Sequence, residues 1–194
     1  LGTEGNRPAL RLAGGALYVN NPNVANSMST QSVGLVSLES GPSSIYVNRP
    51  SSTSTPNLFL TGLTCAPGAT INFGGTSLGA AVSNVSQILI DPEPALQSGL
   101  IGGYARVGND WATYDLNGVK ALTTDSGTIQ GAGAAANVRV AGTQTITSDN
   151  TINSLVWNHN SDLNLGTNGL TLVSGGYIKL YNSHRNLFGT NGGY

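Results

Sequence analysis

Short apolar runs recur at regular intervals through residues 151–181. They cover residues 155–157, 163–165, 170–172 and 178–180, so their starts are almost evenly spaced. Side chains of a strand alternate between its two faces, so a run such as Leu163-Asn164-Leu165 can turn two apolar residues inward and one polar residue outward. The residues between the runs, Gly166, Asn168-Gly169 and Gly175-Gly176, turn the chain at little cost. The pattern predicts short strands separated by tight turns.

Two all-β arrangements are compatible with this spacing. One is an up-and-down meander of hairpins, and the other is a solenoid in which each coil contains three short strands. Strands of three residues are poor units for isolated hairpins, whereas in a solenoid each one pairs with the coils above and below it. Three steps, from residue 155 to residue 178, make a plausible length for one coil of a parallel β-helix. We therefore expect an all-β parallel β-helix with three short strands per coil, forming a single domain over residues 1–194.

The same alternation predicts strands at residues 10–12, 17–19, 33–38, 44–47, 58–60, 71–73, 82–90, 138–140 and 145–147. Residues 48–56 hold two prolines around a Ser/Thr run and predict an exposed loop. A short helical turn is expected only at residues 94–98. The predicted core takes the inward apolar positions of the runs: Leu10, Leu12, Leu58, Leu60, Ile71, Phe73, Leu155, Leu163, Leu165, Leu170, Leu172, Ile178 and Leu180.

Aromatic residues gather in residues 101–115. Tyr104, Trp111 and Tyr114 lie there, with Asp110 and Asp115 beside them. One interpretation is a pair of strands whose aromatic rings cover one face or one end of the core. The other is an aromatic, acidic groove in which the three rings stack against a glycan, since aromatic rings suit the apolar faces of sugars.

Composition narrows the range of partners. Charged residues make up 9% of the chain and the net charge is -1, so there is no basic field for nucleic acid or anionic lipid. No apolar run is long enough to span a bilayer. We expect neither a nucleic-acid partner nor membrane insertion. The chain begins at Leu1 without a signal peptide, which we interpret as a mature product or a fragment of a longer chain.

No constellation of reactive residues stands out. Glycoside hydrolysis needs two carboxyl groups that face one bond, and only Asp110, Asp115 and Asp125 lie close together beside aromatics. An odd separation on one strand would put Asp110 and Asp115 on opposite faces. The possible bases of a lyase (Lys120, Arg139 and Lys179) are isolated, His159 and His184 lack the spacing of metal ligands, and the single cysteine, Cys65, suggests a half-buried side chain. We expect no catalytic residues, metal or cofactor.

Three blocks of sequence resemble the autotransporter-associated β-strand repeat proteins, which are similar to the passengers of autotransporters. The blocks are GLIGGYARVGNDWATYDLNGVKAL (residues 99–122), ANVRVAGTQTITSDNTINSLVW (136–157) and LNLGTNGLTLVSGGYIKL (163–180). The resemblance implies a right-handed parallel β-helix and a secreted or surface location in a bacterium. It implies no catalytic motif.

These observations together predict an extracellular structural or adhesive surface protein that is not an enzyme. The alternative is a carbohydrate-binding or carbohydrate-cleaving β-helix module, with a polysaccharide lyase or hydrolase as the enzymatic form. The N- and C-terminal stretches of the chain show no capping helix and contain little Pro or charge. Unpaired strand edges recruit other strands. We therefore also expect self-association through the ends of the β-helix, into a homo-oligomer or filament.

Overall fold

The computed structural model describes residues 7–21, 24–124, 127–160 and 163–180. Every regular element in these residues is a strand, and none is a helix that could cross a membrane. The chain divides into two compact units, Leu1–Leu122 (unit 1) and Thr123–Tyr194 (unit 2), each with its own apolar core. The single domain expected from the sequence stays a prediction, and each unit is described by itself.

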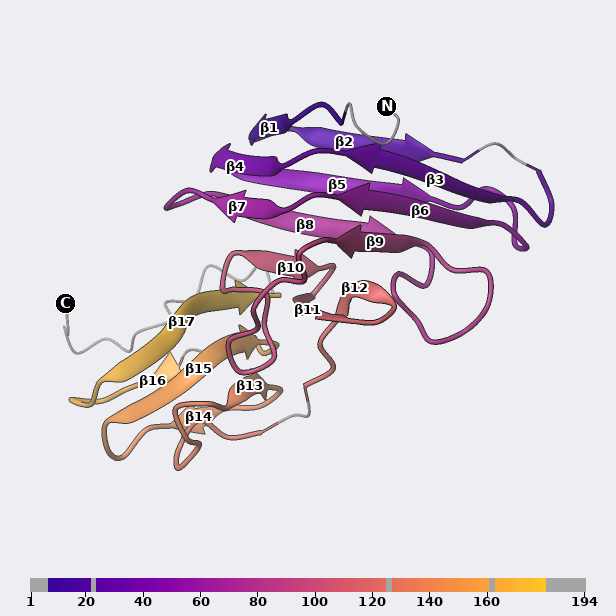
Figure 1. Ribbon diagram of the computed structural model, residues 1–194. Helices are drawn as coiled ribbons and strands as arrows, with labels where there is room; N and C mark the ends of the chain where they lie inside the picture. Colours follow the sequence, from indigo (N-terminus) through magenta and orange to yellow (C-terminus); the bar gives the residue numbers. More distant parts are fainter. Residues whose placement is uncertain (1–6, 22–23, 125–126, 161–162, 181–194) are drawn as a thin grey trace. The chain divides into compact units, whose positions relative to one another are not determined.

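Unit 1 begins with nine strands that form three successive triplets. The first, second and third strands of the triplets pair in parallel with their counterparts, so the strands enter three sheets in rotation (Figure 1). The sheets have the orders β1-β4-β7, β2-β5-β8 and β3-β6-β9. The bounds are β1 (Leu10–Ala13), β2 (Ala16–Asn20), β3 (Met28–Val33), β4 (Val36–Ser40), β5 (Pro42–Asn48), β6 (Thr55–Leu60), β7 (Leu63–Cys65), β8 (Thr70–Gly75) and β9 (Gln87–Ile90).

Strands that pair in unit 1 are farther apart along the chain than the sequence predicted from the three steps between residues 155 and 178. Leu10 pairs with Val36, and Leu58 pairs with Ile88, so paired positions are more widely separated along the chain than those steps. Residues 49–54 before β6 and 76–86 before β9 lengthen the path without adding strands. The predicted loop at residues 48–56 corresponds to the first of these connections.

The core of unit 1 is built from the inward positions of all three sheets. Leu58, Leu60, Ile71 and Phe73 are at most 1% exposed, and Leu12 is also buried, as predicted. Leu10 is half-buried and packs against the same cluster. Alternation explains this arrangement, because each strand turns every second residue toward the other sheets.

Three local predictions in unit 1 were wrong. The expected strand at residues 33–38 is divided, since β3 ends at Val33 and the Gly34 amide donates to the Pro8 carbonyl. Only the end of the stretch 82–90 is a strand, and Val82 is exposed. No helical turn forms at residues 94–98, where Gln97 instead makes an isolated antiparallel bridge with Leu100.

The middle sheet continues through three more strands, β10 (Ala105–Val107), β11 (Asp110–Asp115) and β12 (Gly118–Ala121). Strand β10 pairs in parallel with β8, whereas β10–β11 and β11–β12 are antiparallel. Among the strand pairs of the described residues these two are the antiparallel ones, and all other pairs are parallel. The prediction of parallel sheets is therefore confirmed outside the segment 105–121.

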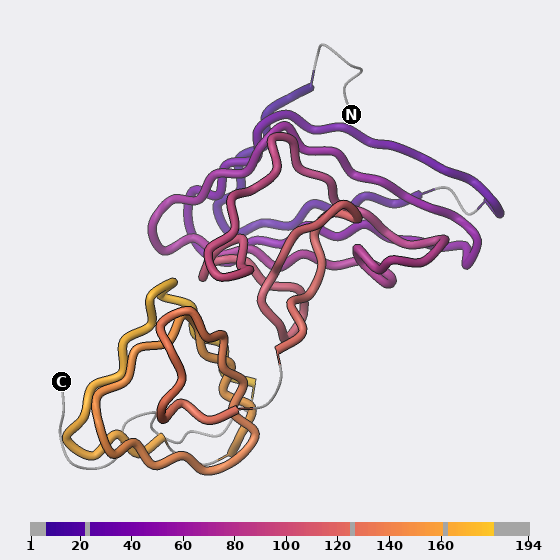
Figure 2. The backbone as a smooth tube through the Cα atoms, turned by 60° about the horizontal axis from the view of Figure 1, so that its bottom comes forward, coloured from indigo at the N-terminus to yellow at the C-terminus, as the bar shows by residue number. Residues whose placement is uncertain are grey.

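Unit 2 repeats the parallel arrangement with shorter separations along the chain. Its strands form the sheets β13-β15-β17 and β14-β16, and Figure 2 shows its orange and yellow turns running beside one another. Val138 pairs with Leu155 and Leu155 with Tyr177, so paired positions are closer along the chain than in unit 1. The bounds are β13 (Asn137–Val140), β14 (Gln144–Thr145), β15 (Asn150–Trp157), β16 (Leu163–Asn164) and β17 (Leu170–Lys179).

The run 170–172 and the first two residues of the run 178–180 belong to one strand, β17, instead of two. Ile152 pairs with Leu172 and Ser154 with Gly176, so the residues between Leu172 and Gly176 bulge opposite Asn153. Gly175 has φ +68° within this bulge, a backbone conformation that glycine adopts without strain. The glycine pair Gly175-Gly176 therefore belongs to a β-bulge within one strand and does not turn the chain. Of the predicted core, Leu155, Leu163 and Ile178 are buried, and the others are half-buried: Leu165, Leu170, Leu172 and Leu180.

Candidate functional site

The three aromatic residues predicted as a glycan platform do not share one exposed surface. Trp111 and Tyr114 lie on β11 at an odd separation, which places them on opposite faces. Trp111 is 3% exposed, while Tyr104 and Tyr114 are half-buried and pack against the core of unit 1. This burial is unfavourable for stacking of Trp111 on a sugar, and the glycan-binding role of the three residues stays a prediction.

Tyr114 binds the edge of β9. Its hydroxyl accepts a hydrogen bond from the Ile90 amide at 2.9 Å and donates one to the Ile90 carbonyl at 3.0 Å. Strand β9 is the last strand of its sheet, so this side chain satisfies backbone groups that a further strand would otherwise bind. The ring thus helps to close one end of unit 1.

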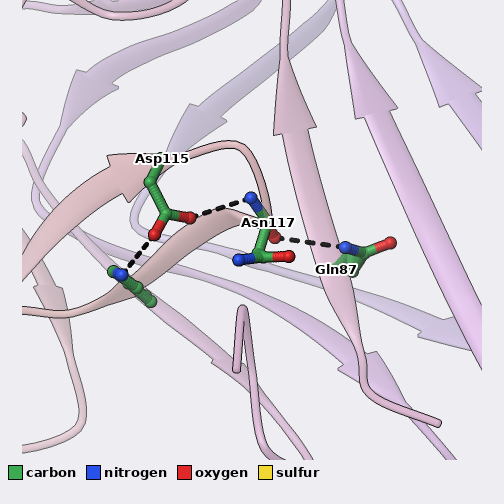
Figure 3. Close-up of polar contacts among 4 residues, drawn as sticks. Gln87, Asp115 and Asn117 are labelled. Carbon is green, nitrogen blue, oxygen red and sulfur yellow. Dashed lines mark hydrogen bonds and ion pairs between the residues drawn. The ribbon is translucent and has the colours of Figure 1, made fainter. Parts of the chain in front are cut away.

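The turn between β11 and β12 lies against the same edge. The Gln87 amide donates to the Asn117 carbonyl at 3.4 Å, and Asp115 accepts from the Asn117 amide at 2.8 Å (Figure 3). A Cβ at Gly118 would overlap the Ile88 carbonyl oxygen, so glycine permits the close approach of β12 to β9. We call residues 105–121 the end segment. It covers an end of the core, as one of the two interpretations of the aromatic cluster predicted.

Replacing Tyr114 with phenylalanine should destabilise unit 1 by about 1–3 kcal/mol at neutral pH, because two backbone groups of Ile90 lose their partner. Burial raises the pKa of Tyr114 above its ordinary value near 10; the Ile90 hydrogen bond lowers it, and the charges of Glu93, Asp91 and Asp115 raise it further. A raised pKa means stability that is present below pH 10 and is lost as the pH rises through the folded-state pKa. Urea unfolding across this alkaline range should show a shallower loss in Tyr114→Phe than in wild type. An equal loss would exclude this residue as its source.

Tyr104 lines a separate groove of about 330 Å³ together with Leu63, Ile90, Pro92 and Glu93. Burial, and secondarily Cys65, raises the pKa of Tyr104. The Cys65 thiol is itself half-buried near the carbonyls of Ala66 and Ala69, and burial raises its pKa. A raised pKa reduces the thiolate fraction, so this environment does not activate the sulfur as a nucleophile.

The carboxylates beside the aromatic residues do not face one another. Asp110 and Asp115 occupy the two ends of β11, and Asp125 lies outside the described residues. The side chain of Lys120 hydrogen-bonds Asp115 and holds the pKa of that carboxyl below its usual value. A general acid needs the opposite shift, because it must keep its proton near neutral pH. This geometry offers no pair for glycoside hydrolysis at β11.

The remaining candidate residues are dispersed. Arg139 lies on β13, Lys179 ends β17, His159 follows β15, and His184 falls outside the described residues. Within the described ranges, no group of three or more His, Cys, Asp or Glu side chains is placed to hold a metal ion.

The outward face of β2, β5 and β8 carries a different aromatic cluster. Tyr18 pairs with Tyr46 and Tyr46 with Gly74, so the three positions form one line across the strands. The two rings are stacked, with centroids 5.6 Å apart and an interplanar angle of 19°. Tyr18 is 63% exposed and Tyr46 is 36% exposed. Large aromatic rings therefore lie on a surface where the sheet turns its polar positions to solvent.

Gly74 sets the position of the Tyr46 ring. A Cβ at residue 74 would overlap this ring, so the absence of a side chain lets the ring lie over the backbone of β8. The side-chain nitrogen of Asn72 donates to the Tyr46 hydroxyl at 3.5 Å. The side-chain oxygen of Asn72 accepts from the backbone amide of Gly108 at 3.0 Å. Strand β8 thus supports the ring at Gly74 and bonds its hydroxyl through Asn72.

Amide side chains continue beside the rings. Asn20 pairs with Asn48 across β2 and β5, and the Asn48 amide donates to the Asn20 side-chain oxygen at 3.3 Å. A groove of about 400 Å³ runs along this surface, at the lower end of the range for small-ligand sites. We call this surface the tyrosine face; its lining residues are Tyr18, Asn20, Tyr46, Val47, Asn48, Gly75 and Thr76.

The sequence contains a signal for the tyrosine face that local strand patterns do not reveal. Tyr-Val-Asn occurs at residues 18–20 and again at residues 46–48. Both copies were predicted as parts of strands, but the predicted ligand site was drawn from aromatic residues close together in sequence. Pairing of β2 with β5 brings the two copies side by side, since they occupy equivalent positions of two parallel strands.

Comparison with protein-family models, curated proteins and solved structures gives no match for this chain. The resemblance of residues 99–180 to autotransporter-associated β-strand repeats therefore remains a prediction.

Proposed function

We propose that this chain is a non-catalytic structural and adhesive segment of an extracellular bacterial surface protein, built as a right-handed parallel β-helix. The observation that carries the proposal is the rotation of strands in unit 1. Three consecutive strands enter three parallel sheets, and the next three follow in the same order. In a solenoid such rotation stacks each coil on the one before it and produces an elongated body with long lateral faces.

The surface chemistry supports a structural rather than a catalytic role. Charged residues make up only 9% of the chain, and some of them are paired in the ion pairs Arg11–Glu39 and Lys120–Asp115. Many of the exposed positions carry Thr, Ser or Asn, which offer hydrogen-bonding groups but no charge. Such a surface suits contact with uncharged extracellular polymers.

Self-association belongs to this proposal in a modified form. Strands β1, β2 and β3 are the end strands of their sheets, whereas the end segment lies against β9 at the other end of the triplets. Unpaired strand edges recruit further strands. The edges of β1, β2 and β3 are therefore a place in unit 1 where a second copy would add its strands.

Labelling of intact cells of the source bacterium tests the proposal. Antibodies against residues 1–194 should decorate the cell surface or extracellular filaments in electron micrographs without permeabilisation. Surface protease should remove the label, and an antibody against a cytoplasmic protein is the control. Label that appears only after permeabilisation would contradict the extracellular role.

A further inference from the structure

The tyrosine face combines exposure with a fixed geometry. The side chain of a surface tyrosine usually samples several rotamers, but here Tyr46 lies over Gly74 and stacks against Tyr18. Both rings come from the middle of paired strands rather than from loops. Binding of a ligand to such a surface costs little side-chain entropy, because the protein's side chains are already ordered.

The hydrogen-bonding groups beside the rings match a polyhydroxylated ligand. The Asn48 amide nitrogen bonds the Asn20 oxygen, and in the described part of the chain the side-chain nitrogen of Asn20 and the side-chain oxygen of Asn48 make no hydrogen bond. These two atoms are one donor and one acceptor, and both residues are exposed. Sugar hydroxyls donate and accept at once, so they can bind both atoms.

The size and charge of the groove exclude other classes of ligand. Its lining holds no charged side chain, so an anionic glycan, a phosphate or a charged peptide would find no counter-ion there. A protein partner needs about 800 Å² on each side of a stable interface, which is a far larger surface than two rings and two amides. A neutral chain that is one sugar wide fits both limits.

We propose that the tyrosine face binds a neutral glycan, with a sugar ring packed against the exposed part of the stacked Tyr18–Tyr46 pair and its hydroxyls bound by Asn20 and Asn48. The ring faces supply the apolar contact that sugars make with aromatic side chains. The inference rests on the adhesive role proposed above and gives that role a ligand and a position. It moves the glycan site from Tyr104, Trp111 and Tyr114 to the outward face of β2 and β5.

Isothermal titration of the full chain with cellohexaose, mannohexaose and chitohexaose tests the proposal, with hexagalacturonate as the acidic comparison. At least one neutral hexaose should bind saturably, with a Kd of about 1 mM or tighter. Tyr18→Ala and Tyr46→Ala should each weaken that binding about tenfold or more. Leu116→Ala is the control, because Leu116 is 92% exposed and lies in the β11–β12 turn.

A pair of glycine variants separates ring position from ring loss. Gly74→Ala keeps both tyrosines but places a methyl group where the Tyr46 ring lies, so the ring must move and binding should fall about tenfold. Gly133→Ala is its matched control, because a Cβ there has nothing within 4 Å. Circular dichroism and thermal unfolding of each variant show whether the fold is intact.

Chemical protection gives a readout on the wild-type chain alone. Nitration by tetranitromethane, mapped by mass spectrometry, should be slower at Tyr18 and Tyr46 when the bound hexaose is present and unchanged at Tyr177. Three results would overturn the proposal: no binding of any neutral hexaose, equal binding by the folded tyrosine variants, or preference for hexagalacturonate. None of them bears on surface labelling of cells, so a failed glycan site and a failed surface role can be told apart.

Discussion

Replacing Phe73 with alanine should lower the free energy of unfolding of unit 1 by about 3–5 kcal/mol. Phe73 is 0% exposed and lies in β8, where it pairs with Ile45 on one side and Val107 on the other. Removing the ring leaves a cavity beside three neighbouring strands of the middle sheet. Parallel strands that are fixed on both sides cannot collapse fully into such a space, so the loss should lie in the upper part of the usual range.

The two tryptophans allow each unit to be followed separately. Trp111 lies in unit 1 and Trp157 in unit 2, and both are buried. In a Trp157→Phe background, fluorescence should show the unit 1 transition moving to lower urea in Phe73→Ala. In a Trp111→Phe background, the unit 2 transition should stay in place. Movement of both transitions by the same amount would contradict separate folding of the units.

Phe59 provides the matched control for Phe73. It lies on β6, is half-buried, and has the Arg7 guanidinium 4.7 Å from its ring centroid. The change Phe59→Ala removes the same atoms from the side of the strand that faces away from the core. It should therefore cost clearly less than Phe73→Ala. Equal costs would mean that the inward and outward positions of unit 1 are wrongly assigned.

Substitution of Gly118 with alanine should detach the end segment from β9. Gly118 has φ +88°, and a Cβ there would overlap the Ile88 carbonyl oxygen and come within 3.1 Å of Leu89. Gly108 is the matched control, because it also has a positive φ, +59°, but a Cβ there has nothing within 4 Å. Both variants carry the cost of a left-handed alanine, about 1–2 kcal/mol, so their difference isolates the steric overlap. We expect Gly118→Ala to be the less stable by a further ~1–3 kcal/mol.

Hydrogen exchange measures where that loss acts. In Gly118→Ala, amides of β9 and β12 should exchange faster, while those of β3 and β6 keep their protection. Analytical ultracentrifugation should also show more association, because the β9 edge is uncovered. Unchanged exchange at β9 would mean that the end segment does not protect this edge.

Alternation of apolar and polar residues predicted many of the strands, and most of the predicted core residues are buried. Parallel pairing was predicted from the shortness and spacing of the runs. Leu58, Ile71 and Phe73 are buried because their neighbours in sequence face outward, a relation that can be read locally. The length of a coil was not predictable in the same way. It depends on connections such as residues 76–86, whose path is set by contacts with distant strands. The bulge at Gly175 has the same origin, since a glycine pair favours a turn and a bulge equally.

The candidate site was harder to find because it exists only after pairing. Tyr18 and Tyr46 belong to paired strands far apart in sequence, and neither is unusual within its own strand. Tyr104, Trp111 and Tyr114 are close in sequence, yet Trp111 and Tyr114 lie on opposite faces of β11 and Trp111 is buried. Proximity along the chain was a poor guide to the candidate site, because in this fold the residues beside a side chain come from a paired strand far away in sequence.

The line of Tyr18, Tyr46 and Gly74 also gives the tyrosine face equally spaced positions across its strands. Adjacent strands of a sheet are about 4.8 Å apart, and each strand contributes one position to the line. Insertion of a further copy of residues 17–44 would add one more such position, which we call a rung, without moving the others. A polymer that spans several rungs would rebind at one while it leaves another, so its residence time would grow with the number of copies. Gene duplication in whole repeats would then tune avidity while each individual contact stayed weak.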